Sequence, residues 1–479
     1  MFETLLPHGG TLLAMGLIFG LYMAWNIGAN DVANAMGTSV GSRALTLKQA
    51  VIAAAIFEFL GAVLVGAHVS GTVRKGIVDP ADFGDPNLFV YGMLGALLAA
   101  GVWLQIASYY GWPVSTTHSI VGAIVGVGVV VAGFEAVKWG KVGTIAASWI
   151  ISPLLSGSMS FCIFQFIRKK IFHAQDPVAA AKHWTPYMVF PVFLILTLVM
   201  LFKGLKNLKL DFTLLESLGI GSVIGVIAAL ISAKLVKRIK VDHGEELPGD
   251  TNSAAVRAHM EKALKQLQRA QVAATPQTHD EVADLVAAAH SLHSRLRTEE
   301  PQSREMVDQK NVERIFIYLQ IVSACFVAFA HGANDVANAI GPLSAVIAVV
   351  QSGAMVGASS SVPLWVLGMG GFGIVIGLAT WGWRVMETVG KKITELTPSR
   401  GFAAEFGAAA TIVVASRLKL PISTTHTLVG AVLGVGLARG MGALNLKTIR
   451  DIVVSWVVTI PAGAFFAIVF FFIFKAIFY

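Results

Sequence analysis

Long apolar stretches alternate with short polar ones along almost the whole chain. Nine of them approach or exceed the roughly 20 residues that a helix needs to cross a bilayer. A helix satisfies its own backbone hydrogen bonds, so the pattern predicts an all-α polytopic membrane protein with about ten to twelve spans. The stretches are 11–27, 48–67, 88–108, 143–167, 187–202, 214–236, 314–330, 363–383 and 450–478.

One segment departs from this pattern. Residues 241–311 are rich in charge, Gln and Ala, which predicts a hydrophilic linker with two helices, broken by the prolines at 248, 276 and 301. The predicted organisation is a first transmembrane repeat (1–167), additional transmembrane helices (168–240), the linker and a second transmembrane repeat (312–479). His290 and His293 of the linker could bind a metal weakly, but a solvated helix face is the simpler interpretation.

Two phrases occur twice, in the same order. Residues 28–34 and 332–338 both read Gly-Ala-Asn-Asp-Val-Ala-Asn, and Pro-x-Ser-Thr-Thr-His occurs at 113–118 and 421–426. Asp335 follows Asp31 by 304 residues, and His426 follows His118 by 308. Two motifs repeated at nearly one offset indicate a duplicated module.

Charge and cysteine content refine this picture. Charged residues make up 13% of the 479 positions, against about 25% in soluble domains, so lipid surrounds most of the chain. The net charge of +8 comes from cations at the ends of spans, such as 168–170, which is typical of cytoplasmic loops and not of nucleic-acid binding. Cys162 and Cys325 lie in apolar runs and are expected to be packing residues. The N-terminus lacks the basic region of a cleaved signal peptide.

The first phrase and two carboxylates are expected inside the membrane. Residues 28–42 are rich in small apolar side chains, which favours a broken helix buried in protein over a solvated loop. Glu58 and Glu405 each interrupt an apolar helix, a placement that by default marks a functional site. They are not at equivalent positions of the repeats, because Glu58 aligns with Ile374 and Glu405 with Leu97.

The second phrase predicts two half-helices. Pro followed by Ser and Thr is a typical helix start, and the helix after it is too short to cross comfortably. Free first-turn amides, the helix dipole and three hydroxyls together suit an anion. The hydroxyls are Ser115, Thr116 and Thr117 in one copy and Ser423, Thr424 and Thr425 in the other. His118 and His426 could be proton-transferring groups or structural hydrogen-bonding residues.

These groups predict coupled transport. Cation ligands are offered by Asn30, Asp31, Asn34, Asn334, Asp335 and Asn338, with Glu58 and Glu405. An anion beside carboxylates needs cations to enter with it, which couples the two. An intramembrane hydrolase using Ser115 or Ser423 would not explain the duplication, and a channel would not call for two anion-binding helix ends.

Together, the paired phrases, residues 329–342 and the segment 401–405 resemble the inorganic phosphate transporter (PiT) family, over everything except 241–311. The resemblance implies an inverted-repeat fold of about twelve helices with broken or re-entrant half-helices at the substrate site. It also implies termini outside, the linker in the cytoplasm, and phosphate uptake driven by a cation gradient. The six Ser and Thr residues would hold phosphate. Asp31, Asn34, Asp335 and Asn338 would hold Na⁺, with Glu58 and Glu405 as further coupling carboxylates.

The retained Asn30 and Thr116-Thr117 place the chain nearer the sodium-coupled branch of that family. Proton-coupled phosphate or metal–phosphate symport and a sulfate carrier of the same fold stay open. We expect no enzyme activity, no cofactor beyond the coupling ion and no nucleic-acid partner. A multi-pass location in the plasma membrane (the inner membrane of a bacterium) and a homodimer complete the expectations.

Overall fold

A computed structural model describes residues 6–66, 77–201, 212–239, 250–275, 278–355, 362–417 and 422–479, and within these ranges the regular elements are all helices. The first repeat contains α1 (Gly9–Gly41), α2 (Leu47–Val65), α4 (Pro86–Tyr110), α5 (Thr116–Ala132) and α6 (Trp139–Ile167). The second contains α10 (His279–Ser352), α11 (Leu364–Thr380), α12 (Trp383–Glu387), α13 (Pro398–Arg417), α14 (Thr424–Arg439) and α15 (Leu446–Phe478). Between them lie α7 (Pro177–Val199), α8 (Leu214–Lys237) and α9 (Asp250–Ala273).

Membrane-spanning helices dominate the bundle. Within the described residues, seven helices are long and apolar enough to span a bilayer, and eight if the bent pair α11 and α12 is counted as one span. The predicted figure of about twelve also includes helices that are shorter or more polar, such as α5, α7, α13 and α14. The prediction of an all-α polytopic fold is confirmed.

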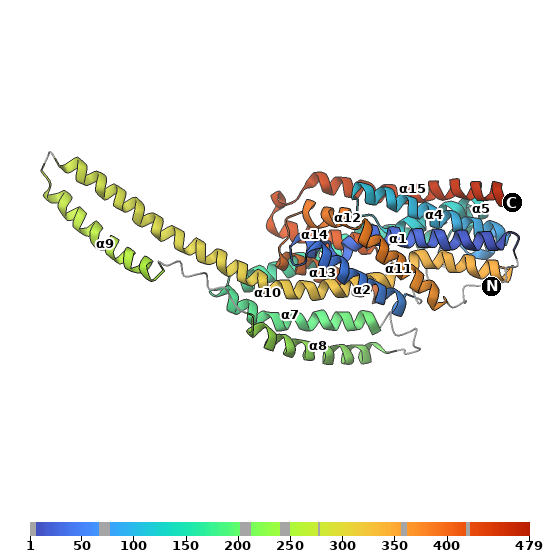
Figure 1. Cartoon of the computed structure of the whole chain (residues 1–479), viewed down its shortest axis with the longest axis horizontal. Helices are drawn as coiled ribbons and strands as arrows, with labels where there is room; N and C mark the ends of the chain where they lie inside the picture. The colour runs from blue at the N-terminus through green and yellow to red at the C-terminus, as the bar shows by residue number, and fades with distance from the viewer. Residues whose placement is uncertain are drawn as a thin grey trace.

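The two repeats pack as inverted copies of each other. Helix α1 packs against α11, whereas α10 packs against α2; similarly, α4 packs against α15, whereas α13 packs against α6. Figure 1 shows α1 running from the terminal end of the bundle toward the linker end, and the second half of α10 running the opposite way. Exchanged neighbours and reversed directions are what an inverted-topology repeat produces.

Glycines set these exchanged contacts. A Cβ added to Gly28 of α1 would lie 2.0 Å from the carbonyl oxygen of Ile374, and one added to Gly332 of α10 would lie 2.1 Å from that of Glu58. Only glycine allows backbones to approach this closely. The paired contacts also show that Glu58 and Ile374 occupy equivalent positions, as the alignment predicts.

Helix breaks occur at other places than the sequence predicts. The predicted broken helix at 28–42 is wrong: α1 runs unbroken through it, although residues 26–39 are buried as expected. The apolar stretch 363–383, predicted to form one span, is instead divided, with a 58° bend between α11 and α12. The break falls at Trp381 and Gly382, and glycine is among the residues at which helices kink.

The short helix α14 is held by a small-residue face of α6. The hydroxyl groups of Ser156 and Ser160 donate to the carbonyl oxygens of Thr427 and Ala431, at 2.6 and 2.7 Å. Gly157 lies between these serines and leaves room for the backbone of α14. Small residues of this kind let helices approach closely where no hydrophobic force drives them together.

The linker forms a helical hairpin outside the bundle. Helix α9 and the start of α10 extend away from the membrane helices, at the end opposite the two chain termini (Figure 1). The two predicted linker helices are therefore confirmed. The predicted break at Pro301 is wrong, because α10 continues through it and past residue 311 into the second repeat.

Candidate functional site

The two copies of the first phrase meet in the centre of the bundle. Asp31 of α1 and Asp335 of α10 are both buried, with His331 between them. The His331 Nε2 atom lies 2.7 Å from Asp335 Oδ2 and 3.7 Å from Asp31 Oδ2. His331 reaches Asp335 because residues four apart share one face of a helix. The tertiary structure thus joins two carboxylates that are 304 residues apart.

Asparagines of each repeat reach the half-helix of the other repeat. Asn34 donates to Thr425 Oγ1 at 2.9 Å, and Asn338 donates to Thr117 Oγ1 at 3.1 Å. The same two amides donate to the carboxylates one turn earlier, Asp31 at 2.9 Å and Asp335 at 3.3 Å. The crossed pairs place the start of each half-helix beside a carboxylate.

Four further hydroxyl contacts lie at this junction. Asn338 also donates to Thr116 at 3.2 Å, and Thr424 donates to Asp335 Oδ2 at 3.4 Å. The Thr425 hydroxyl lies 3.2 Å from Asp31 Oδ1 and 3.3 Å from the Val114 carbonyl oxygen, and its one hydrogen can serve either acceptor. All four threonines therefore lie in the layer between α1 and α10.

Ser115 and Ser423 are the N-caps of α5 and α14. The hydroxyl oxygen of each accepts the backbone N–H three residues later, from His118 and His426, at 3.2 Å. Each hydroxyl hydrogen is still available to donate. The other first-turn amides have no acceptor within their own helix, so they point the positive end of the helix dipole at the site. Both half-helices begin at the serine, as the sequence predicts.

Asn30 and Asn334 have different surroundings. Asn30 donates to Ser108 Oγ at 3.1 Å and to the Trp112 carbonyl oxygen at 3.0 Å, and it accepts from the Val114 N–H at 3.2 Å. It therefore holds the loop that leads into α5. Asn334 donates to Asp335 Oδ1 at 3.0 Å and is only partly buried.

Glu58 joins the carboxylate cluster through His331. Its Oε1 atom lies 3.5 Å from His331 Nδ1, and both side chains are buried. Because the imidazole uses its other nitrogen toward Asp335, His331 links three carboxylates. The aligned residues of the other half are Ile27 and Ile374, both fully buried and apolar. The site is thus asymmetric although the backbone is repeated.

Glu405 lies in a separate polar pocket. It accepts hydrogen bonds from Thr38 at 2.5 Å and Ser39 at 3.0 Å, both on α1, and from Ser323 on α10. The Gln320 amide lies 3.4 Å from it. Thr38 follows Asp31 by seven residues, which is about 10 Å along a helix. The structure therefore does not bring Glu405 into the central cluster.

His118 and His426 meet between the half-helices. Their rings are 4.9 Å apart in a T-shaped contact, with Trp456 stacked 3.7 Å from His426 and Trp149 5.1 Å from His118. Both histidines are buried. Aromatic packing accounts for their position, and within the described residues neither ring contacts a carboxylate.

The central donor set fits a small hard cation. Asp31 Oδ2 and Asn34 Oδ1 are buried acceptors that find no hydrogen-bond donor among the described residues. Ligand atoms of Asp31, His331 and Asp335 all lie within 4.8 Å of one another. Carboxylate and amide oxygens are the ligands that hard cations prefer. A small cation at this cluster could give the unpaired Asp31 Oδ2 oxygen a partner.

Sequence reasoning missed several residues of the site. His331 directly precedes the second copy of the first phrase, where the first copy has Ile27, and this polar-for-apolar difference was the available signal. Around Glu405 it missed Thr38, Ser39, Gln320 and Ser323. Their polarity within otherwise apolar stretches is weak evidence until α1, α10 and α13 are seen to pack together.

Comparisons with known proteins match this architecture. A family model described as the phosphate transporter family matches residues 27–467. The chain belongs to this family. A solved structure titled "The sodium-dependent phosphate transporter" is 36% identical, covers 98% of this chain and 100% of its own, and superposes with a TM-score of 0.76.

Curated relatives agree over nearly the whole chain. A putative phosphate permease of Chlamydia pneumoniae is 46% identical and covers 98% of this chain and 99% of its own length. A putative phosphate permease of Pyrococcus abyssi is 44% identical and covers 96% of this chain and 97% of its own length. Inorganic phosphate transporter 2-1, chloroplastic, of Arabidopsis thaliana is 45% identical. The match covers 96% of this chain and 72% of the relative's own length. The resemblance drawn from the repeated phrases is confirmed, and a transporter family excludes the hydrolase interpretation.

Proposed function

We propose that this phosphate transporter family member imports inorganic phosphate by symport with sodium, through alternating access to the central site. The observation that carries the proposal is the crossed contact of Asn34 with Thr425 and of Asn338 with Thr117. These contacts tie an anion-binding helix end of each repeat to a carboxylate-bearing helix of the other.

Phosphate would bind at the two half-helix starts. Thr116, Thr117, Thr424 and Thr425 supply hydroxyl donors, Ser115 and Ser423 retain their hydroxyl hydrogens, and the first-turn amides add backbone donors. No lysine or arginine is needed for this recognition. Dipoles alone would hold the oxyanion, in a layer flanked by Asp31 and Asp335.

Sodium would bind to the carboxylate side of the same layer. Asp31, Asn34, Asp335 and Asn338 offer oxygen ligands, and the sodium charge offsets both the carboxylates and the incoming phosphate. Without the cation, phosphate would enter a buried site beside two like charges, which is strongly unfavourable. Coupling then follows from electrostatics, since neither ion is stable in the site alone.

Glu405 would serve as a second cation or coupling site. Thr38, Ser39 and Ser323 bring hydroxyl oxygen atoms to its carboxylate, and oxygen ligands are what a sodium ion prefers. Helices α1 and α10 supply residues both to the Glu405 pocket and to the central cluster. Relative motion of the two helices would therefore change both sites together.

Proton coupling is a second candidate, and His331 is the observation that favours it. Its ring bridges Asp31, Glu58 and Asp335, so a proton on the imidazole could offset carboxylate charge as sodium would. The structural relative is a sodium-dependent phosphate transporter, which favours sodium as the first proposal. A plasma-membrane location and a homodimeric assembly belong to the same proposal.

Uptake of radiolabelled phosphate into proteoliposomes of the purified protein would test it. We expect accumulation with an inward sodium gradient and little with a proton gradient alone, and weak competition by sulfate. Accumulation driven by protons alone would reject sodium coupling and favour His331 as the proton-coupling group. Uptake of sulfate in place of phosphate would reject the substrate while retaining the anion site.

A further inference from the structure

A large apolar cavity lies outside the repeated part of the protein. Its volume is about 880 Å³, and it opens between α7, α8 and α10. Helices α7 and α8 lie side by side along the bundle (Figure 1), where Gly221 and Gly225 of α8 bring the two backbones close together. The cavity wall is almost entirely aliphatic and aromatic, including Val189, Val192, Phe193, Ile224, Ile227 and Leu319.

The polar groups of the wall are concentrated at one end. The hydroxyls of Thr185 and Ser232 donate to carbonyl oxygens of their own helices, at 2.7 and 3.2 Å, so they turn little polarity toward the cavity. The remaining polar side chains are Tyr318, Arg238 and Arg314. Among the described residues neither arginine forms an ion pair, and the neighbouring Glu313 is bonded to Ser399 at 2.7 and 2.8 Å.

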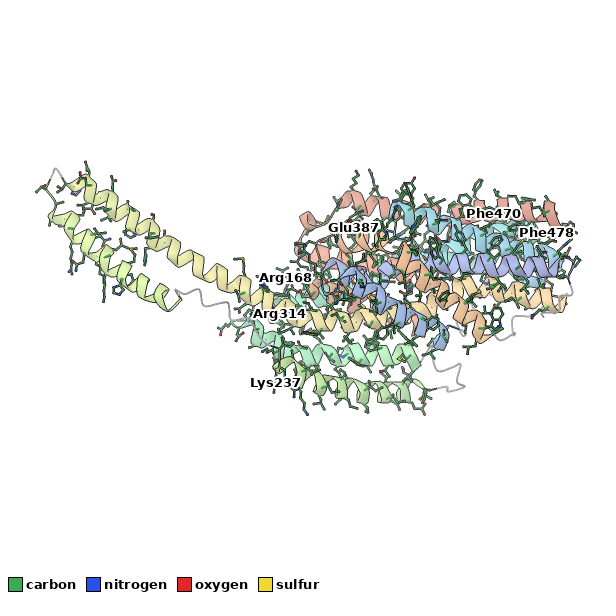
Figure 2. The ribbon with its side chains drawn as sticks, viewed as in Figure 1. Arg168, Lys237, Arg314, Glu387, Phe470 and Phe478 are labelled. Atoms are coloured by element: carbon green, nitrogen blue, oxygen red, sulfur yellow. The ribbon has the colours of Figure 1, made fainter. Side chains whose placement is uncertain are left out.

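Both arginines lie at the linker end of the bundle. Figure 2 shows Arg314 and Lys237 there, and Lys182 Nζ lies 3.4 Å from the Ile239 carbonyl oxygen at the same end. Cations at this end indicate the cytoplasmic surface of the membrane. From Arg314 the cavity wall continues to Val322, eight residues and about 12 Å along α10. This is close to one leaflet of the hydrocarbon core, about 15 Å.

We propose that an anionic phospholipid of the cytoplasmic leaflet occupies this cavity. Its phosphodiester binds Arg238 and Arg314, and an acyl chain fills the aliphatic slot between α8 and α10. The side chains of Ile227, Ile231 and Tyr318 are more than half exposed, so the slot opens sideways to the bilayer. Basic pockets between membrane helices at this surface bind such headgroups. The inference goes beyond the proposed function and does not depend on the transported ion.

Native mass spectrometry of the purified protein would test the site, using dioleoyl phosphatidylglycerol as the anionic probe and dioleoyl phosphatidylcholine as the neutral one. We expect preferential retention of phosphatidylglycerol. Each arginine near the surface contributes about fivefold to anionic lipid binding, so Arg238→Ala with Arg314→Ala should weaken retention about thirtyfold. Lys237→Ala is the matched charge control, because Lys237 lies at the same helix end but outside the cavity wall. It should reduce lipid retention less than either arginine variant does.

A second pair of variants tests the slot. Ala228→Trp fills the cavity and should abolish retention, whereas the adjacent Ala229→Trp lies outside the wall and should preserve it. Equal retention of both lipids, or retention unaffected by the arginine and Ala228 variants, would overturn the proposal. A third outcome would also overturn the proposal: the protein retains no lipid, and Ala228→Trp abolishes its dimerisation. The occupant of the cavity would then be a second copy of the chain.

Discussion

The His331 and Glu58 side chains meet 3.5 Å apart in the core, at a position where the other repeat has two buried isoleucines. The glycine contacts that establish the equivalence, Gly332 with Glu58 and Gly28 with Ile374, are nearly identical in length. The two repeats therefore share a backbone arrangement here, although one copy is polar and the other apolar. Under the proposed function, side chains on a repeated backbone would therefore supply the coupling chemistry.

Removing His331 should expose this asymmetry. His331→Ile leaves three buried carboxylates without their shared imidazole, and breaking a buried pair in this way costs about 3–5 kcal/mol. Adding Glu58→Ile recreates the pair of the other repeat and should recover part of that loss. Thermal unfolding of the detergent-purified variants measures both effects. A double variant no more stable than His331→Ile alone would contradict the equivalence.

Neutralising one central carboxylate should uncouple transport. Asp31→Asn keeps the shape of the site, but a buried charged ligand is worth about 2–5 kcal/mol, so the sodium half-saturation constant should rise more than about thirtyfold. Sodium-driven phosphate uptake in proteoliposomes measures this, and Asp335→Asn should behave similarly. Asp82→Asn, in an exposed turn, is the control. Normal uptake by Asp31→Asn would remove this residue from the proposed sodium site.

The half-helix hydroxyls should determine phosphate affinity. Thr116→Val and Thr424→Val each remove a donor to a charged ligand, which is worth about 1.5–3 kcal/mol, so the phosphate half-saturation constant should rise about tenfold or more. Thr197→Val is a matched control, because Thr197 bonds only within α7 among the contacts described for it. Unchanged affinity in both variants would argue against phosphate at the helix ends.

Alanine in place of glycine should lower stability where two helices cross, but not on an open helix surface. At Gly28 or Gly332 a Cβ would lie 2.0–2.1 Å from the backbone of the facing helix, so alanine must force the helices apart at a cost of about 1–3 kcal/mol or more. At Gly219 of α8 nothing lies within 4 Å, and alanine should stabilise by about 0.5–1 kcal/mol. Unfolding in detergent compares the three. Tolerance of alanine at Gly28 would reject the close packing.

The linker hairpin should be dispensable for transport chemistry. It extends away from the bundle. The carboxylate cluster and the crossed Asn–Thr pairs lie on α1, α2, α5, α10 and α14 within the membrane part. Deleting residues 255–300 should leave the sodium and phosphate half-saturation constants within about twofold, since surface changes distant from a site are usually small. Uptake kinetics decide this, and loss of phosphate binding would assign the hairpin a direct role.

The sequence alone determined the all-α membrane fold, the duplication and the half-helix starts. These features depend on local chemistry: apolar length for a span, and Ser115 or Ser423 as a cap for a short helix. The repeated phrases also pointed to most residues of the centre, because a motif retained in two copies is visible without coordinates. Family membership followed from the same phrases.

Only the tertiary structure decided which of these residues touch. Three features depend on how the two inverted repeats pack: the proximity of Asp31 to Asp335, the crossed Asn–Thr pairs and the bridge through His331. No local pattern encodes that relation. The same holds for Glu405, which aligns with Leu97 yet finds its hydroxyl partners on α1 and α10. Helix continuity was also a tertiary outcome. Burial and packing keep α1 helical through residues 28–41, where the sequence predicts a break.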